Sequence, residues 1–183
     1  MAFDRDAPPD RRREAALACA GDVTAAPALL AALPGEPVAV VRDAIVTALA
    51  ATGDPAAAEG LAALVGSEDA ALRNAALDGL RRMPAEVALP PLLGLLGRPD
   101  ADLRLLATGV LSAFPAGTVR GTLHAVLAQD PEANVGLAAV EVLAQAGSIE
   151  DADALRGFAA RFEHEPMVRF AVRAALGQIG AAP

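Results

Sequence analysis

Residues 169–180 read RFAVRAALGQIG, and the spacing of the apolar side chains in this stretch decides the fold. Together with Val168, which precedes the stretch, Val172 and Leu176 recur every four residues, so the three lie on one face of a helix. Related segments occur at intervals of about 30 residues, the kind of period that indicates a repeat protein. These segments begin at Arg13, Arg42, Arg73, Arg104 and Gly136. The sequence therefore predicts six amphipathic helices of a first kind.

Three positions of these segments are predicted to form the core seam, because they share one face of a 3.6-residue helix. The position before each start holds Arg12, Val41, Leu72, Leu103, Val135 and Val168. The third position after each start holds Ala16, Ile45, Ala76, Ala107, Ala139 and Val172. The seventh position after each start holds Ala20, Leu49, Leu80, Leu111, Leu143 and Leu176.

A second set of apolar segments lies between the first, and its leucines keep the same register, as in Leu61, Leu92 and Leu123. Gly, Pro and Asp separate the segments, where they end one helix and begin the next. A lone helix pair cannot bury its apolar face, so neighbouring pairs must stack. We therefore predict an all-α fold, a right-handed α-solenoid (superhelix) of about five and a half helix pairs. Residues 1–10 are expected to form an N-terminal arm and residues 11–183 a single domain.

The repeat openings resemble those of HEAT repeats, in particular the short repeats of the phycobilisome-lyase-like group. The residues that carry the resemblance are Asp69-Ala-Ala-Leu72-Arg73, Pro99 to Arg104, and Pro166-Met-Val168-Arg169. The resemblance covers about residues 11 to 180. It implies a solenoid fold, while function in such folds depends on surface sites.

Composition disfavours several functional classes. The formal net charge is −8, the 15 basic residues are all Arg, and aromatic residues make up 3% of the chain. Nucleic-acid binding needs clustered positive charge and, for single strands, stacking aromatics, so a nucleic-acid binder is a disfavoured alternative. No apolar run has the length of a signal peptide or a membrane span. We expect a bacterial, cytoplasmic protein with no membrane or nucleic-acid partner.

The pair His164-Glu165 is the strongest suspicion of a metal site in the sequence. Deoxyhypusine hydroxylase, a HEAT-like iron enzyme, carries His-Glu directly after the repeat arginine. The corresponding pairs here are Asp43-Ala44, Asn74-Ala75, Leu105-Leu106, Leu137-Ala138 and Phe170-Ala171. His164-Glu165 instead precedes Pro166, where it favours the start of the final helix. The sequence predicts no catalytic residue, no metal and no cofactor.

Other reactive or charged residues have structural interpretations. Cys19 aligns with small core residues, which predicts a buried, inert thiol. The repeat arginines (Arg42, Arg73, Arg104 and Arg169) follow acidic residues and are expected to form a ladder of hydrogen bonds between repeats. His124 lies in a register that points away from the leucine seam, which predicts a surface histidine or, alternatively, a histidine of a binding groove.

If the second helices line the concave face, that face carries few charges and many small residues. The candidate partner-binding residues are Glu59, Leu93, His124, Asp153 and Arg156. Such a surface suits a docked helix or an extended peptide. We therefore predict a non-catalytic protein-protein interaction or scaffold module. The alternative is an accessory factor of the phycobilin-lyase type that acts on a tetrapyrrole. An end-to-end homodimer through the C-terminal helix is a further expectation.

Overall fold

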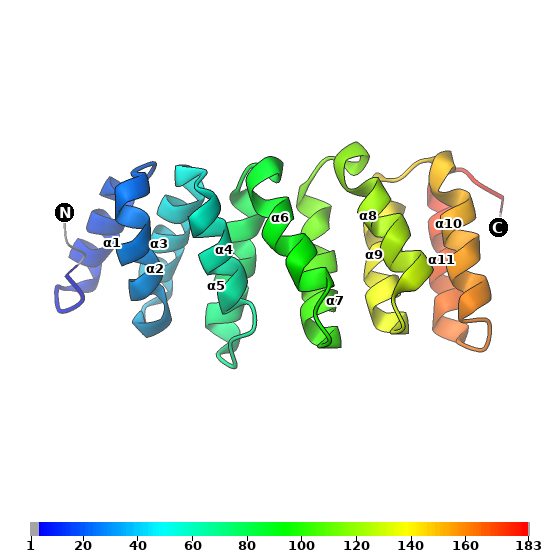
Figure 1. The fold of residues 1–183 in the computed structure, drawn as a ribbon, viewed down its shortest axis with the longest axis horizontal. Coiled ribbons are helices and arrows are strands. Elements are labelled where there is room, and N and C mark those ends of the chain that lie inside the picture. Colours follow the sequence, from blue (N-terminus) through cyan, green and yellow to red (C-terminus); the bar gives the residue numbers. More distant parts are fainter. Residues whose placement is uncertain (1–3, 183) are drawn as a thin grey trace. The chain divides into compact units, whose positions relative to one another are not determined.

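The computed structural model describes residues 4–182, and every regular element in that range is a helix. Eleven α-helices and four short 3-10 helices make up the described range, and Figure 1 shows the order of the α-helices. The elements are α1 Pro9–Ala18, η1 Val23–Ala25, α2 Ala26–Ala32, η2 Leu33–Gly35, α3 Ala39–Thr52, α4 Pro55–Leu64, α5 Ala70–Arg82, α6 Ala85–Leu96, α7 Ala101–Val110, η3 Leu111–Ala113, α8 Ala116–Gln129, α9 Ala133–Ala146, η4 Ile149–Asp151, α10 Ala152–Arg161 and α11 Pro166–Gln178.

The helices fall into two compact units, which divide at the end of α6, between Leu95 and Leu96. The first helix begins at Pro9, so that residues 4–8 precede it. The division into an arm of residues 1–10 and one domain of residues 11–183 stays a prediction.

Within each unit the helices pack in two layers. The first helices of the repeats pack side by side, α3 between α1 and α5 in one unit and α9 between α7 and α11 in the other. The second helices form the other layer, with α2 against α4 and α8 against α10. Figure 1 shows α8 and α10 in front of α9 and α11. Each amphipathic helix therefore buries its apolar stripe between the layers.

The predicted seam is the core of both units. At the seventh position, the leucines from Leu49 to Leu176 are buried, with at most 3% of the side chain exposed. At the third position all six residues, from Ala16 to Val172, are buried. Leu61, Leu92 and Leu123 of the second helices are fully buried as well. The all-α solenoid of five and a half helix pairs is thus confirmed, while the right-handed sense and the superhelix stay predictions.

Two seam positions were predicted wrongly. Ala20 is exposed, because α1 already ends at Ala18 and the chain turns at Cys19. Leu103 is only partly buried, and the neighbouring Arg104 is buried in its place. In both cases a local feature, a helix end or an ion pair, overrides the apolar period.

Helix ends follow the expected rules. Asp54, Asp69 and Asp100 are N-caps whose side chains accept backbone N–H groups of the first helical turn. This satisfies donors that have no partner within the helix. Gly53 closes α3 in the left-handed conformation, with φ of 59°, which glycine adopts without steric strain. Pro166 occupies the first turn of α11, as predicted.

Cys19 and Gly136 lie in closely packed positions. Cys19 is buried, as predicted from its alignment with small residues. Gly136 takes the place of the repeat arginine in α9, and the ring of Phe158 from α10 lies against it. A β-carbon at Gly136 would overlap Phe158 Cε2 and Cζ. The departure from the arginine pattern is therefore a packing requirement.

Among the described residues, no helix combines the length and the apolar character that a membrane span requires.

Candidate functional site

In the unit that ends at Leu95, the predicted binding residues Glu59 and Leu93 lie on the outer faces of α4 and α6. Both are exposed, and Leu93 keeps 48% of its surface in contact with solvent. Small residues flank them, including Ala63, which is exposed, and Gly94, where an added β-carbon would meet nothing within 4 Å. We call the exposed faces of α4 and α6 the α4–α6 surface.

In the unit that begins at Leu96, the other three predicted residues lie on α8 and α10, which pack against each other. Asp153 and Arg156 are exposed and face each other at 3.3 Å, an ion pair within α10. Arg156 Nη2 also donates to the carbonyl oxygen of Ala182 at 2.7 Å. His124 on α8 is half-buried. We call the exposed faces of α8 and α10 the α8–α10 surface. Together, the α4–α6 and α8–α10 surfaces are the second-helix surfaces.

His124 is held by a buried carboxylate. Its Nε2 lies 2.7 Å from Oδ1 of Asp151, a residue that is fully buried. About a third of the His124 side chain, 33%, remains exposed. His124 is therefore a partly exposed histidine that Asp151 fixes in place, and only its outer edge is open to a partner.

Two further groups, the Ser148 N–H and the Arg120 guanidinium, lie against Asp151. Its Oδ2 accepts the backbone N–H of Ser148 at 2.7 Å, and the Ser148 side chain accepts the N–H of Glu150 in a capping box. Arg120 Nε lies 3.1 Å from Asp151 Oδ1, and the same guanidinium bonds to Glu150 and to Ser148 Oγ. A charge buried in this way is stable only when it is paired and hydrogen-bonded. The cluster therefore ties α8 to the turn before α10.

Across residues 4–182, no three His, Cys, Asp or Glu side chains gather in an arrangement that could hold a metal ion. His164 is almost fully exposed, with 94% of its side chain in solvent, and lies 3.3 Å from Glu163. Glu165 takes the N-cap position of α11 without a side-chain capping hydrogen bond. The pair His164-Glu165 therefore lies in the turn before the helix.

Three repeat arginines bind the loop that precedes their helix. Each donates through Nη1 to the backbone carbonyl oxygen six residues earlier. The bonds run from Arg73 to Ser67 at 2.8 Å, from Arg104 to Arg98 at 3.0 Å and from Arg169 to Glu163 at 2.9 Å. Each bond gives a partner to a loop carbonyl oxygen. These arginines are thus structural, and we call the three bonds the loop clamps.

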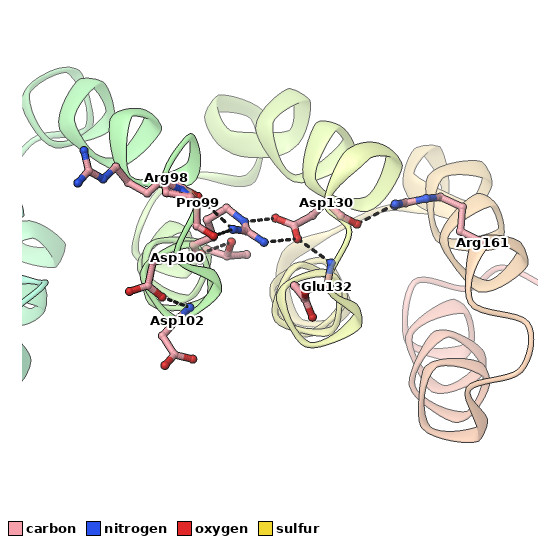
Figure 2. A network of polar contacts seen from close by, with 9 residues as sticks. Arg98, Pro99, Asp100, Asp102, Asp130, Glu132 and Arg161 are labelled. Atoms are coloured by element: carbon pink, nitrogen blue, oxygen red, sulfur yellow. Dashed lines mark hydrogen bonds and ion pairs between the residues drawn. The ribbon is translucent and has the colours of Figure 1, made fainter.

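Two arginines also pair with an acid of the following repeat. Arg104 binds Asp130 through two parallel hydrogen bonds of 2.8 and 3.1 Å, and Arg12 binds Glu36 at 2.8 and 2.9 Å. Figure 2 shows that Asp130 also accepts the N–H of Glu132, while its carbonyl oxygen accepts Arg161. Of the arginines predicted to form a ladder between repeats, Arg104 makes such a contact, whereas Arg12 was not among them. The acids that precede the arginines, Asp69 and Asp100, cap helices instead.

These pairs lower the pKa of both acids. For Glu36, the hydrogen bond from Arg12 lowers the pKa and outweighs the burial that raises it. For Asp130, burial raises the pKa, but the bonds and charge of Arg104 together with the N–H of Glu132 lower it further. Both acids therefore stabilise the fold in their ionised form.

We expect a pH-dependent loss of stability from Asp130. Its folded pKa lies below its ordinary value of 3.8, so its contribution is fully present above 3.8 and is lost as the pH falls through the folded pKa. The free energy of unfolding, measured with urea, should differ between the wild type and Asp130→Asn most strongly at neutral pH. The difference should shrink below about pH 4. Asp153→Asn, a change at an exposed acid, is the control, and a difference that grows in acid would contradict the assignment.

The structure contains a groove that the sequence did not predict. It has a volume of about 360 Å³ and lies between the first helices α3 and α5. Its lining residues combine small apolar side chains with polar ones, in the order Ala39, Arg42, Asp43, Val46, Ala71, Asn74, Ala75 and Asp78. We call it the α3–α5 groove.

Asp43 and Asp78 of this groove share one cation. Arg82 Nη2 lies 2.9 Å from Asp43 Oδ1 and also pairs with Asp78, while its Nη1 donates to Thr47 Oγ1 at 2.8 Å. All three charged side chains are at least 40% exposed. Arg42 also lines the groove, so the two carboxylates are matched by two guanidinium groups and the formal charges balance.

The comparisons with known proteins concern the fold. The sequence pattern of the family described as HEAT repeats matches residues 2–81, 26–112 and 89–177. Two engineered proteins with crystal structures are 18% and 19% identical to the chain. They cover 98% and 97% of it over 95% of their own lengths, with TM-scores of 0.45 and 0.43. No curated protein sequence matches the chain.

Proposed function

Because the chain belongs to the HEAT-repeat family, we propose that it is a non-catalytic interaction module that binds a peptide or helix of another protein. Proteins of this fold generally act as protein-interaction scaffolds. Stacked repeats give a rigid surface whose side chains vary without loss of the core. The binding residues of the proposal are those of the second-helix surfaces: Glu59, Leu93, His124, Asp153 and Arg156.

The observation that carries the proposal is the exposure of Leu93 among small residues. A leucine that is 48% exposed beside Gly94 offers apolar surface with open space around it. A partner's leucine or aromatic side chain gains free energy by covering that surface, at about 25 cal/mol per Å². Gly121 and Gly157 leave similar open space beside His124 and Arg156. Each second-helix surface therefore leaves room for a partner's side chain beside these residues.

Charge limits the class of partner. The net charge of −8 opposes binding to a nucleic-acid backbone, so the proposal names a protein partner. We propose that the protein acts in the cytoplasm of a bacterium. The alternative function follows from the resemblance to the phycobilisome-lyase-like group. In it, the same surfaces bind a tetrapyrrole.

A displayed library of random peptides tests the proposal. We expect the wild type to select peptides with a recurring aromatic or leucine anchor, and Leu93→Glu to weaken their binding at least about tenfold, as for a hot-spot residue. Leu17→Glu, which adds the same charge to an exposed leucine of α1, should leave binding unchanged. Binding is measured by fluorescence anisotropy of a selected peptide.

Two outcomes would overturn this function. Selected peptides that bind Leu93→Glu as well as the wild type would show that the α4–α6 surface does not bind them. A visible absorbance change on mixing the protein with a free bilin, in the absence of peptide selection, would favour the tetrapyrrole alternative.

A further inference from the structure

We infer that the α4–α6 surface binds a basic segment of its partner, in which an apolar anchor covers Leu93 and Lys or Arg side chains pair with Glu59 and Glu86. The inference rests on the function proposed above and adds the charge of the peptide or helix that is bound. It concerns only the unit that ends at Leu95.

The helices α4 and α6 contain acidic residues but no basic one. Glu59 is the one charged residue of α4, and Glu86 is the one charged residue of α6. Both side chains are exposed, and neither forms an ion pair with a described residue. Helix α2, the second helix of the preceding repeat, has no charged residue, and Arg5 donates there to the carbonyl oxygen of Ala31. The charge on α4 and α6 is therefore of one sign.

A structural role accounts for only one of the two acids. Glu86 lies in the first turn of α6, where a carboxylate stabilises the positive end of the helix. Glu59 is the fifth residue of α4, beyond its first turn, and the cap of that helix is already Asp54. No described residue forms a hydrogen bond with the side chain of Glu59. Its charge is therefore free to pair with a cation of a partner.

The arginines that lie near α6 in the sequence do not pair with these acids. Arg82, at the end of α5, binds the two aspartates of the α3–α5 groove. Arg81 follows Asn74 by seven residues, so it shares the face of α5 that lines that groove. Arg98 comes after the last residue of α6, which lies about 15 Å along the helix from Glu86. The negative charge of the α4–α6 surface is therefore not balanced at Glu59 and Glu86.

The two acids lie on either side of the exposed leucine. The equivalent buried leucines of α4 and α6 are 31 residues apart, Leu61 and Leu92. The same offset places Glu59 level with Pro90, which Glu86 precedes by four residues and Leu93 follows by three. Positions three, four and seven residues apart share one face of a helix. In Figure 1, α6 comes next after α4 along the row of second helices, so one short peptide can reach all three side chains.

This arrangement favours a basic segment over a neutral or an acidic one. Packed neighbouring helices are about 8–10 Å apart, which is close to the screening length of about 10 Å in 0.1 M salt. Both carboxylates therefore act on a cation that lies beside Leu93. Opposite charges at the edge of an apolar contact speed association and select the partner, whereas like charges repel it. A leucine or aromatic anchor with Lys or Arg on either side matches both features of the surface.

The peptide library described above tests the charge of the partner. We expect the peptides that depend on Leu93 to carry Lys or Arg within about four residues of the anchor, which is one helical turn. A fluorescein-labelled selected peptide is the probe, and a synthetic counterpart with Gln in place of its Lys and Arg should bind at least about tenfold more weakly. Raising the salt concentration should weaken the binding of the basic peptide more than that of its counterpart.

Variants of the protein test the two acids. Glu59→Gln and Glu86→Gln should each weaken binding of the basic peptide about two- to fivefold, as for an exposed ion pair, and the double variant about tenfold. Glu141→Gln removes the same charge from an exposed acid of α9 and should have no effect, so it separates local charge from net charge. Circular dichroism and thermal melts check that each variant folds, Glu86→Gln above all.

Charge reversal is the sharpest test. A double variant with Glu59→Arg and Glu86→Arg should select acidic peptides from the same library, with the same kind of apolar anchor.

The outcomes distinguish this inference from the proposed function. Selected peptides that depend on Leu93 but lack basic residues would overturn the inference alone, as would equal binding by the wild type and the double Gln variant. A loss in Glu141→Gln as large as that in Glu59→Gln would also overturn it, because net charge would then explain the effect. A wild type that selects no peptide would overturn both.

Discussion

Replacing Asp151 by Ala should lower the free energy of unfolding by about 3 kcal/mol, because charge-assisted hydrogen bonds contribute about 1.5–3 kcal/mol each and a buried acceptor is lost. The carboxylate is fully buried and accepts the Ser148 N–H, while His124 and Arg120 both lie against it. Its removal leaves the N–H of Ser148 without an acceptor and separates α8 from the turn before α10. Urea unfolding followed by circular dichroism measures the loss.

Glu150→Ala is the matched control for this prediction. Glu150 adjoins Asp151 and pairs with the same Arg120, yet 69% of its side chain is exposed. An exposed ion pair contributes between about 0 and 1 kcal/mol, so this variant should stay close to the wild type. Equal losses for the two variants would show that burial of Asp151 does not determine its contribution. A further readout is binding of the selected peptides, since displacement of His124 alters the adjoining second-helix surface.

Replacing Gly136 by Ala should lower the free energy of unfolding by about 2–3 kcal/mol, the upper part of the range for overpacked cores. The new β-carbon would overlap the ring of Phe158, which is itself 1% exposed and has no open space to enter. Phe158 also contacts Phe162, with ring centroids 5.2 Å apart, so a shift of one ring displaces the other. The ring or the helix α9 must move, and both movements open gaps elsewhere.

Gly121→Ala is the control for the glycine substitution. Gly121 lies inside α8, is exposed, and an added β-carbon would meet nothing within 4 Å. Alanine should therefore stabilise the helix by about 0.5–1 kcal/mol. In the Gly136→Ala background, Phe158→Leu should recover part of the lost stability, because the smaller side chain vacates the space. A loss in both glycine variants, or no recovery, would contradict the packing argument.

The helices and their buried faces were predictable because both follow from local spacing. A period of about 3.6 residues determines which side chains share a face, and the six copies of the seam repeat that information. The prediction fails at Ala20, where the helix ends early, and at Leu103, where the pair of Arg104 with Asp130 draws the arginine into the interior. Helix ends and ion pairs depend on neighbours that the period does not describe.

The polar contacts were only partly predictable. The sequence indicates that the repeat arginines serve the structure, but Asp130 follows Arg104 by 26 residues and is brought to it by the packing of successive repeats. Asp151 was missed for a similar reason. A carboxylate beside Ser148 in a turn is ordinary in sequence, and its burial depends on α8 packing over that turn. Arg12 and Glu36 are 24 residues apart and Arg104 and Asp130 are 26 apart, so no common spacing along the chain marks these pairs.

The candidate binding residues were placed on the second helices by register, and there the exposed positions agree with the structure for Glu59, Leu93, Asp153 and Arg156. Whether they bind a partner stays a prediction. The α3–α5 groove was missed, because the alanines among its lining residues indicate in sequence only a high helix propensity. A groove forms where two neighbouring helices both lack large side chains. The sequence of a single segment does not show this.

The loop clamps have a consequence for how such a chain can change. Each arginine recognises a peptide carbonyl, which every amino acid provides, and the residues that supply it are as different as Ser67, Arg98 and Glu163. The hydrogen bond from the arginine therefore does not depend on the side chain at that position. A dye, a charge or a new recognition residue can therefore be introduced at these three positions while the hydrogen bond from the arginine is retained.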